Sequence, residues 1–261
     1  MMISIQWFLN KRPNIALINS CFLALTLIAT PVALANYVPG DQKPVPPERK
    51  SDGGTTRGCS AGDIPLTVLA SRNYVGQTIS QRPMFAWFVP PDSASKEMKF
   101  IIYELVSENN YQEIRAISLQ TTPGIMKLSP FSENDPGLEV GKEYVWQVVI
   151  FCDPSSLSSA IVDRASIKVV TPPHQLQSQL ILAANGVEKA RIYARAGLWY
   201  NALGEALKLA EPSKLGEMGS ALLKDLAEWE TSRTTLELTP QEQEMIEKRV
   251  ENLEQIANST R

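Results

Sequence analysis

The spacing of apolar residues along the chain changes near residue 171. Before that point, short apolar runs alternate with proline, glycine, asparagine and serine, and after it apolar residues recur at helical spacing. Short punctuated runs are typical of β-strands, whereas a period of three to four residues is typical of amphipathic helices. The sequence therefore predicts an α+β chain, in which an antiparallel β-sandwich is followed by an all-α module.

The first part of the chain contains runs with strand character. These runs are residues 66–70, 85–89, 98–106, 113–119, 124–128, 144–151 and 165–170. Their length and spacing are typical of sandwiches of the immunoglobulin or fibronectin type III kind. The alternation of Tyr144, Trp146 and Val148 indicates one buried strand face, and Trp87 is predicted to be another core aromatic.

Residues 138–146 resemble the corner between two strands of fibronectin type III domains. In that corner a tyrosine hydroxyl bonds back to the backbone. The resemblance gives structural roles to Leu138, Gly141 and Tyr144, although Val140 stands where proline is usual.

The helical part contains four apolar stripes, and the last begins with the capping-box residues Thr239 to Glu242. Residues 190–212 resemble one tetratricopeptide-type helix pair, in which Trp199 and Tyr200 are a candidate partner face. The alternative is an ordinary helical hairpin that packs on its neighbours, because no second copy of the repeat follows.

The first 35 residues have the pattern of an export signal. Basic residues precede a mostly apolar run at residues 15–29, and residues 33–35 have the small-x-small pattern of a cleavage site. The run is shorter than the roughly 20 residues of a membrane-spanning helix, so a retained anchor is the weaker alternative. We therefore expect cleavage near Asn36 and a periplasmic or extracellular protein of a gram-negative-type envelope.

These patterns divide the chain into successive parts. We predict a signal peptide at 1–35, a flexible leader rich in proline, glycine and charge at 36–58, a β-sandwich domain at 59–171, a linker at 172–176 and a helical domain at 177–258.

Charge and cysteine content bear on the partners of the protein and on a predicted disulfide. The chain has 25 lysine and arginine residues against 28 aspartate and glutamate residues, and it lacks a basic cluster, so we expect no nucleic-acid partner. We also expect no stable membrane span after signal cleavage. Cys59 and Cys152 follow the signal, and an even pair in an oxidising compartment predicts a disulfide, with two separate thiols as the alternative.

Candidate catalytic residues are sparse. His174 is the single histidine of the sequence, and a Gly-x-Ser-x-Gly motif centred on Ser60 follows a glycine-rich leader instead of a strand. We therefore predict no catalytic residue, no cofactor and no metal site. The alternatives are a cell-envelope hydrolase that depends on Ser60 or on carboxylates, and a carbohydrate-binding protein with exposed aromatics such as Tyr111, Trp199 or Tyr200.

An ordered set of motifs resembles domain-of-unknown-function family 928, which comprises exported proteins found chiefly in photosynthetic bacteria. The motifs are residues 53–59, 83–90, 141–146, Cys152 and 197–203. The resemblance implies a fold and a location and brings no activity or ligand. Together with the fold signals, it leads us to expect a non-enzymatic binding or scaffolding protein of the envelope, with an unidentified protein or glycan partner.

Overall fold

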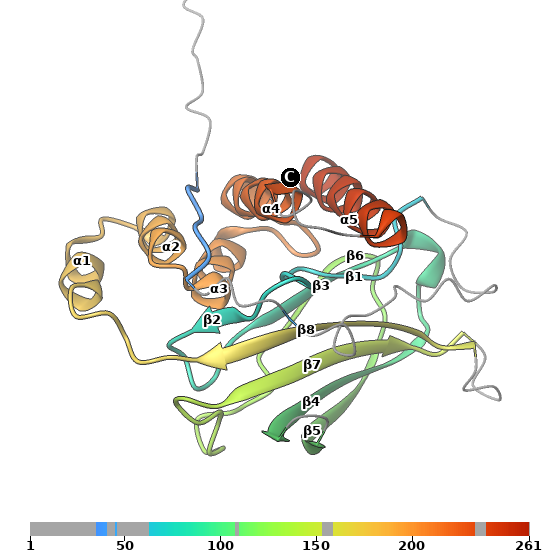
Figure 1. Ribbon diagram of the computed structural model, residues 1–261, viewed down its shortest axis with the longest axis horizontal. Helices are drawn as coiled ribbons and strands as arrows, with labels where there is room; N and C mark the ends of the chain where they lie inside the picture. Colours follow the sequence, from blue (N-terminus) through green and yellow to red (C-terminus); the bar gives the residue numbers. More distant parts are fainter. Residues whose placement is uncertain are drawn as a thin grey trace, which may run out of the picture. The chain divides into compact units, whose positions relative to one another are not determined.

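The strands form two sheets, and most of the helices that follow lie on one side of them (Figure 1). The computed structural model describes residues 35–40, 45, 63–107, 110–152, 159–232 and 239–260. Residues 33–261 form one compact unit. The predicted signal segment up to residue 34 lies outside the described residues.

The smaller sheet is antiparallel and has the strand order β1-β3-β6. Its strands are β1 (Thr67–Val68), β3 (Phe85–Val89) and β6 (Gly124–Leu128). Every residue of β3 is buried, as expected for a strand that consists only of apolar side chains. A short 3-10 helix, η2 (Pro91–Ser93), follows β3 in the connection to the second sheet.

The larger sheet is mixed and has the order β2-β8-β7-β4-β5. Its strands are β2 (Gly76–Thr78), β8 (Ile161–Val169), β7 (Glu143–Ile150), β4 (Glu97–Ser107) and β5 (Asn110–Gln120). Strand β2 pairs in parallel with β8, and the other pairs are antiparallel.

The predicted α+β class is confirmed, because antiparallel and mixed sheets precede a set of helices. Strands β3 and β6 have the predicted bounds. Strand β2 was not predicted, because Gly76, Gln77 and Thr78 contain no apolar run and form a strand only by pairing with β8. Strand β8 begins at Ile161, four residues before the predicted start at residue 165. The prediction missed these residues because the buried Asp163 interrupts the apolar pattern of the strand.

Helices occupy the region in which helical spacing was predicted. They are α1 (Leu176–Leu182), α2 (Gly186–Arg195), α3 (Trp199–Leu209), α4 (Gly216–Thr231) and α5 (Pro240–Ser259). The capping box of α5 is confirmed, because Thr239 Oγ1 accepts from the Glu242 amide while the Glu242 carboxylate accepts from the Thr239 amide.

The turn between α2 and α3 depends on Gly197. Its φ of +75° lies in the left-handed region, and an added Cβ would be 2.4 Å from the Cα of Gly40. Only glycine therefore allows the N-terminal segment to cross this turn.

Aromatic rings join the two sheets. The Phe85 ring of β3 lies 5.1 Å from the Phe100 ring of β4 and 5.0 Å from the Trp146 ring of β7, measured between centroids. Trp87 stacks on Phe100 at 6.1 Å, and both Trp87 and Trp146 are fully buried. These two tryptophans therefore lie in the core, as the sequence predicted.

Helix α3 supplies two further aromatics to the same core. Trp199 and Tyr200 are only 1% and 2% exposed. The Trp199 indole donates to the Leu69 carbonyl at 2.8 Å, and the Trp146 indole donates to the Tyr200 hydroxyl at 2.8 Å. The prediction of a partner face at Trp199 and Tyr200 was wrong, because the first turn of α3 is buried against the sheets.

The N-terminal segment also contributes to the core. Tyr37 is 2% exposed, its ring meets the Trp199 ring edge-on at 4.8 Å, and its amide donates to the Asp225 carboxylate at 2.7 Å. The Trp229 indole donates to the Tyr37 carbonyl at 2.7 Å. Residues 36–40 are therefore packed, and the prediction that they belong to a flexible leader was wrong for this stretch.

We expect Tyr200→Phe to lower the free energy of unfolding by about 1–3 kcal/mol, because the buried Trp146 indole loses its acceptor. The lost hydroxyl also donates to the Ser166 carbonyl at 3.2 Å. Urea unfolding measures the change. Tyr193→Phe is the matched control, because Tyr193 is only half-buried. Equal stability of the two variants would contradict this account.

Candidate functional site

The predicted corner residues lie at the start of β7. Leu138 is buried, and its amide donates to the Gln81 carbonyl at 2.7 Å. The Tyr144 hydroxyl accepts from the Glu139 amide at 2.9 Å, which is the contact that the corner interpretation requires. Gly141 has a φ of +90°, so it turns the chain where a side chain would be strained. These residues have a structural role here.

The other candidate residues do not assemble into one site within the described residues. Cys59 and Ser60 lie outside the described residues, so the disulfide and the serine nucleophile stay predictions. Cys152 is half-buried at the end of β7. His174 is exposed in the loop before α1, and Tyr111 is 37% exposed on β5.

A cluster of four charged residues beneath α5 was missed by sequence reasoning. It consists of Arg72, Asp163, Glu230 and Arg249. Asp163, Glu230 and Arg249 are 1%, 0% and 4% exposed. Two acids and two bases come from four separate elements, so the cluster has no signature in sequence spacing.

Asp163 is the centre of this cluster. Its carboxylate accepts from the amides of Val68 at 2.7 Å and Arg164 at 2.8 Å, and it pairs with the Arg72 guanidinium at 2.7 Å. A buried carboxylate needs such partners, because desolvation otherwise disfavours its charged form. Asp163 therefore fixes the position of β1 against β8.

Arg249 joins the cluster from α5. Its guanidinium donates to the carbonyls of Val68 and Ala70 and lies 3.9 Å from Asp163 and 3.8 Å from Glu230. Burial lowers the pKa of Arg249 to about 10, nearby Arg72 adds to this effect, and both acids oppose it. The Arg249 side chain therefore remains protonated at neutral pH.

An apolar tip is exposed at the end of α1. Ile181 and Leu182 are 75% and 84% exposed. Leu176 and Leu180 occupy the inward side of this short helix, so the next two side chains face outward. We refer to Ile181 and Leu182 as the α1 tip.

The sequence around the α1 tip carries no formal charge. Residues 169–187 contain neither an acidic residue nor a lysine or arginine. Exposed apolar side chains in uncharged surroundings are typical of contact surfaces, because a partner removes them from water without desolvating charges. The α1 tip is therefore the candidate interaction surface.

No three histidine, cysteine, aspartate or glutamate side chains among the described residues are placed to hold a metal ion. None of the described helices combines the length and apolarity that spanning a bilayer requires.

One family model matches most of the chain. The model of the family described as Domain of Unknown Function (DUF928) matches residues 52–236, which is more than half of the chain. The chain belongs to the DUF928 family. No curated protein matches the chain. The match includes both sheets and α1 to α4, whereas α5 and residues 35–40 lie beyond it.

The buried cluster therefore spans the limit of the DUF928 match. Asp163 and Glu230 lie inside the matched range, and Arg249 lies outside it. A helix beyond the family region thus supplies a cation to a pair of acids within that region.

We expect Arg249→Met to lower the free energy of unfolding by about 3–5 kcal/mol, because removal of one partner leaves buried acids with less compensation. Urea unfolding provides the measurement, and Lys248→Met on the exposed side of α5 is the control. Adding Glu230→Leu to Arg249→Met should cost less than the sum of the single changes. Additive losses would show that the two side chains are not coupled.

Proposed function

We propose that this member of the DUF928 family is an exported envelope protein that acts by binding or scaffolding. The α1 tip is the observation that carries the proposal. Complete burial of a leucine or isoleucine side chain contributes about 1.5–3 kcal/mol, so Ile181 and Leu182 offer a partner a substantial apolar contact. The partner that fits best is a protein surface that is itself apolar and weakly charged.

The remaining arrangement suits a scaffold. Helices α2 and α3 form a hairpin whose core positions face the sheets, and α1 extends this layer toward its edge (Figure 1). Because Leu176, Ile192 and Leu198 hold α1 in a separate small core, the tip is presented on a packed base. A fixed tip loses little conformational entropy when it binds.

We further propose that the two sheets are a fibronectin-type-III-like sandwich. The orders β1-β3-β6 and β8-β7-β4-β5 and the Tyr144 hydroxyl bond at the corner support this relationship. The parallel strand β2 is then an addition at the edge of the larger sheet. Such sandwiches occur in many binding proteins, which agrees with the proposed role.

Export rests on the signal pattern of the first 35 residues. Tyr37 lies in the core of the folded unit, so cleavage near Asn36 would keep this residue. An oxidising compartment also favours the predicted bridge between Cys59 and Cys152.

We expect the exported protein to begin at Asn36 and Ala33→Tyr to block this processing, because the small residue of the cleavage site is lost. Intact-mass measurement of periplasmic and cytoplasmic fractions tests this expectation. Leu34→Tyr is the matched control, since the middle position of the motif tolerates large residues. Accumulation of full-length protein only in the cytoplasm would overturn the export proposal.

We expect a photo-crosslinking residue at position 182 to give a discrete protein adduct in cells, and Ile181→Ser to abolish that adduct. The substitution should leave the melting temperature unchanged, because Ile181 is 75% exposed. A crosslinker at position 106 is the control, since Val106 is another exposed apolar residue, at 53%, on β4. Identical adduct patterns at 182 and 106 would contradict the binding proposal.

A further inference from the structure

A half-buried carboxylate on α4 lies next to the predicted cleavage site. Asp225 is half-buried, and its Oδ2 atom accepts from the Tyr37 amide at 2.7 Å. Burial raises the pKa of Asp225, the hydrogen bond from Tyr37 opposes this effect, and the charge of Glu228 adds to it. Within the described residues, Asp225 forms no ion pair with a lysine, arginine or histidine. The carboxylate therefore has a neutral donor where a cation would compensate its burial.

Two side chains of α4 hold the backbone of Tyr37. Asp225 accepts from its amide, and the Trp229 indole donates to its carbonyl at 2.7 Å. Positions 225 and 229 are one helical turn apart, so both side chains project from the same face of α4. Tyr37 is also buried against the Trp199 ring. Its amide is therefore fixed beside Asp225, and the residue before it is brought to the same carboxylate.

Covalent geometry keeps the Asn36 nitrogen close to Asp225. The nitrogen atoms of consecutive residues are separated by about 3–4 Å, because only two carbon atoms lie between them. Since the Tyr37 nitrogen is 2.7 Å from Asp225 Oδ2, the Asn36 nitrogen lies within about 7 Å of this oxygen in any conformation. Rotation about ψ of Asn36 alone changes this distance.

Cleavage changes the charge of the Asn36 nitrogen. In the intact chain it is a neutral peptide nitrogen. Hydrolysis of the bond between Ala35 and Asn36 consumes one water, whose hydroxyl goes to the Ala35 carbonyl carbon, and Asn36 leaves as an amine. An α-amino group has a pKa of about 7.7–8.0, so this amine is mostly protonated at neutral pH. Processing therefore creates a cation one residue from the amide that already bonds to Asp225.

The surroundings of Asn36 suit a chain end. Ala35 is fully buried, so the new terminus begins against the protein. In the intact chain Asn36 has a φ of +55°, in the left-handed region, where contacts with the preceding carbonyl disfavour most residues. Cleavage removes that carbonyl and with it the constraint on Asn36.

We propose that Asp225 binds the α-ammonium group of Asn36 once the signal segment is removed. The carboxylate then accepts from two successive backbone nitrogens, the ammonium of Asn36 and the amide of Tyr37. Because the cation exists only after cleavage, the pair stabilises the processed chain and not its precursor. This inference rests on the proposed export and on cleavage before Asn36.

Thermal unfolding of the chain 36–261 tests the pair. Residues 33–261 form one compact unit, so this chain contains the whole fold. It is released from a fusion protein by a protease that leaves Asn36 as the first residue. Transamination with pyridoxal phosphate then converts the terminal amine into a ketone, which carries no charge. We expect the ketone form to melt at least about 2 °C lower than the amine form, because the charged hydrogen bond to Asp225 is lost.

Two variants of α4 show whether Asp225 is the partner. Asp225→Asn removes the charge but keeps an acceptor for the Tyr37 amide, and its ketone and amine forms should melt at the same temperature. Glu228→Gln on the exposed side of α4 is the matched control, and its ketone form should melt lower, as in the unaltered chain.

The proposal is overturned if the two forms of the unaltered chain melt together. It is also overturned if transamination lowers the melting temperature of Asp225→Asn equally, or if Glu228→Gln abolishes the difference. Because the terminus is set outside the cell, these outcomes do not depend on export. A failure of the export proposal appears instead in the intact mass of the periplasmic protein.

Discussion

The packing of the first turn of α3 against both sheets determines much of the rest of this structure. The hydroxyl of Tyr200 accepts from the Trp146 indole and donates to the Ser166 carbonyl, so one side chain joins a helix to β7 and β8. The Tyr200 ring also lies 5.7 Å from the Phe85 ring of the smaller sheet. Because both sheets and the helix share this contact, the helical layer is held to the strands, and Trp199 and Tyr200 are unavailable to partners.

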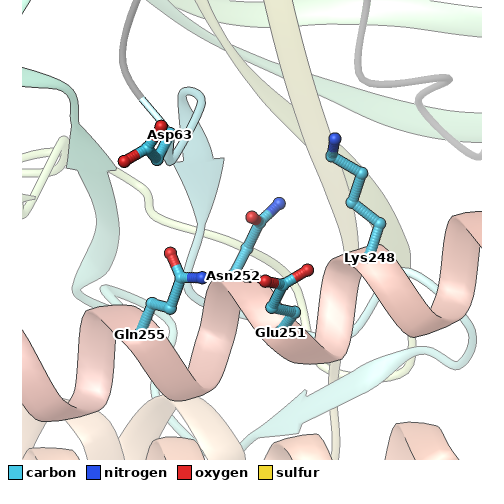
Figure 2. Close-up of a pocket in the computed structure, with 5 residues that line it drawn as sticks. All are labelled: Asp63, Lys248, Glu251, Asn252 and Gln255. Atoms are coloured by element: carbon cyan, nitrogen blue, oxygen red, sulfur yellow. Dashed lines mark hydrogen bonds between the residues drawn. The ribbon is translucent and has the colours of Figure 1, made fainter.

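Segments outside the DUF928 region complete the same core from two directions. Tyr37 covers Trp199 on one side, and α5 brings Arg249 over the acids Asp163 and Glu230 on the other. A buried cation needs its anions in fixed geometry, so this cluster sets the rotation of α5 about its own axis. The same rotation places Lys248, Glu251, Asn252 and Gln255 of α5 where they line a pocket with Asp63 (Figure 2).

The exposed features that remain differ in chemistry and in place. The α1 tip is apolar, which suits a protein surface, whereas the pocket beside α5 is lined by polar and charged side chains. Both stand on packed helices and are therefore preorganised.

Local pattern alone determined much of the secondary structure. The apolar run of β3, the helical stripes and the capping box at Thr239 and Glu242 each depend on neighbours within a few residues, so sequence reasoning located them. The sequence also predicted export and the core positions of Trp87 and Trp146. Of these predictions, the structure describes only the positions of the two tryptophans.

Tertiary structure decided which residues are available to a partner and which are buried. The sequence placed Trp199 on a candidate partner face and Tyr37 in a flexible leader, because the partners of both residues are distant in sequence. The α1 tip is exposed only because Leu176 and Leu180 take the inward face of α1. Burial is a property of the assembled chain, since it depends on contacts between residues far apart, and no local pattern specifies those contacts.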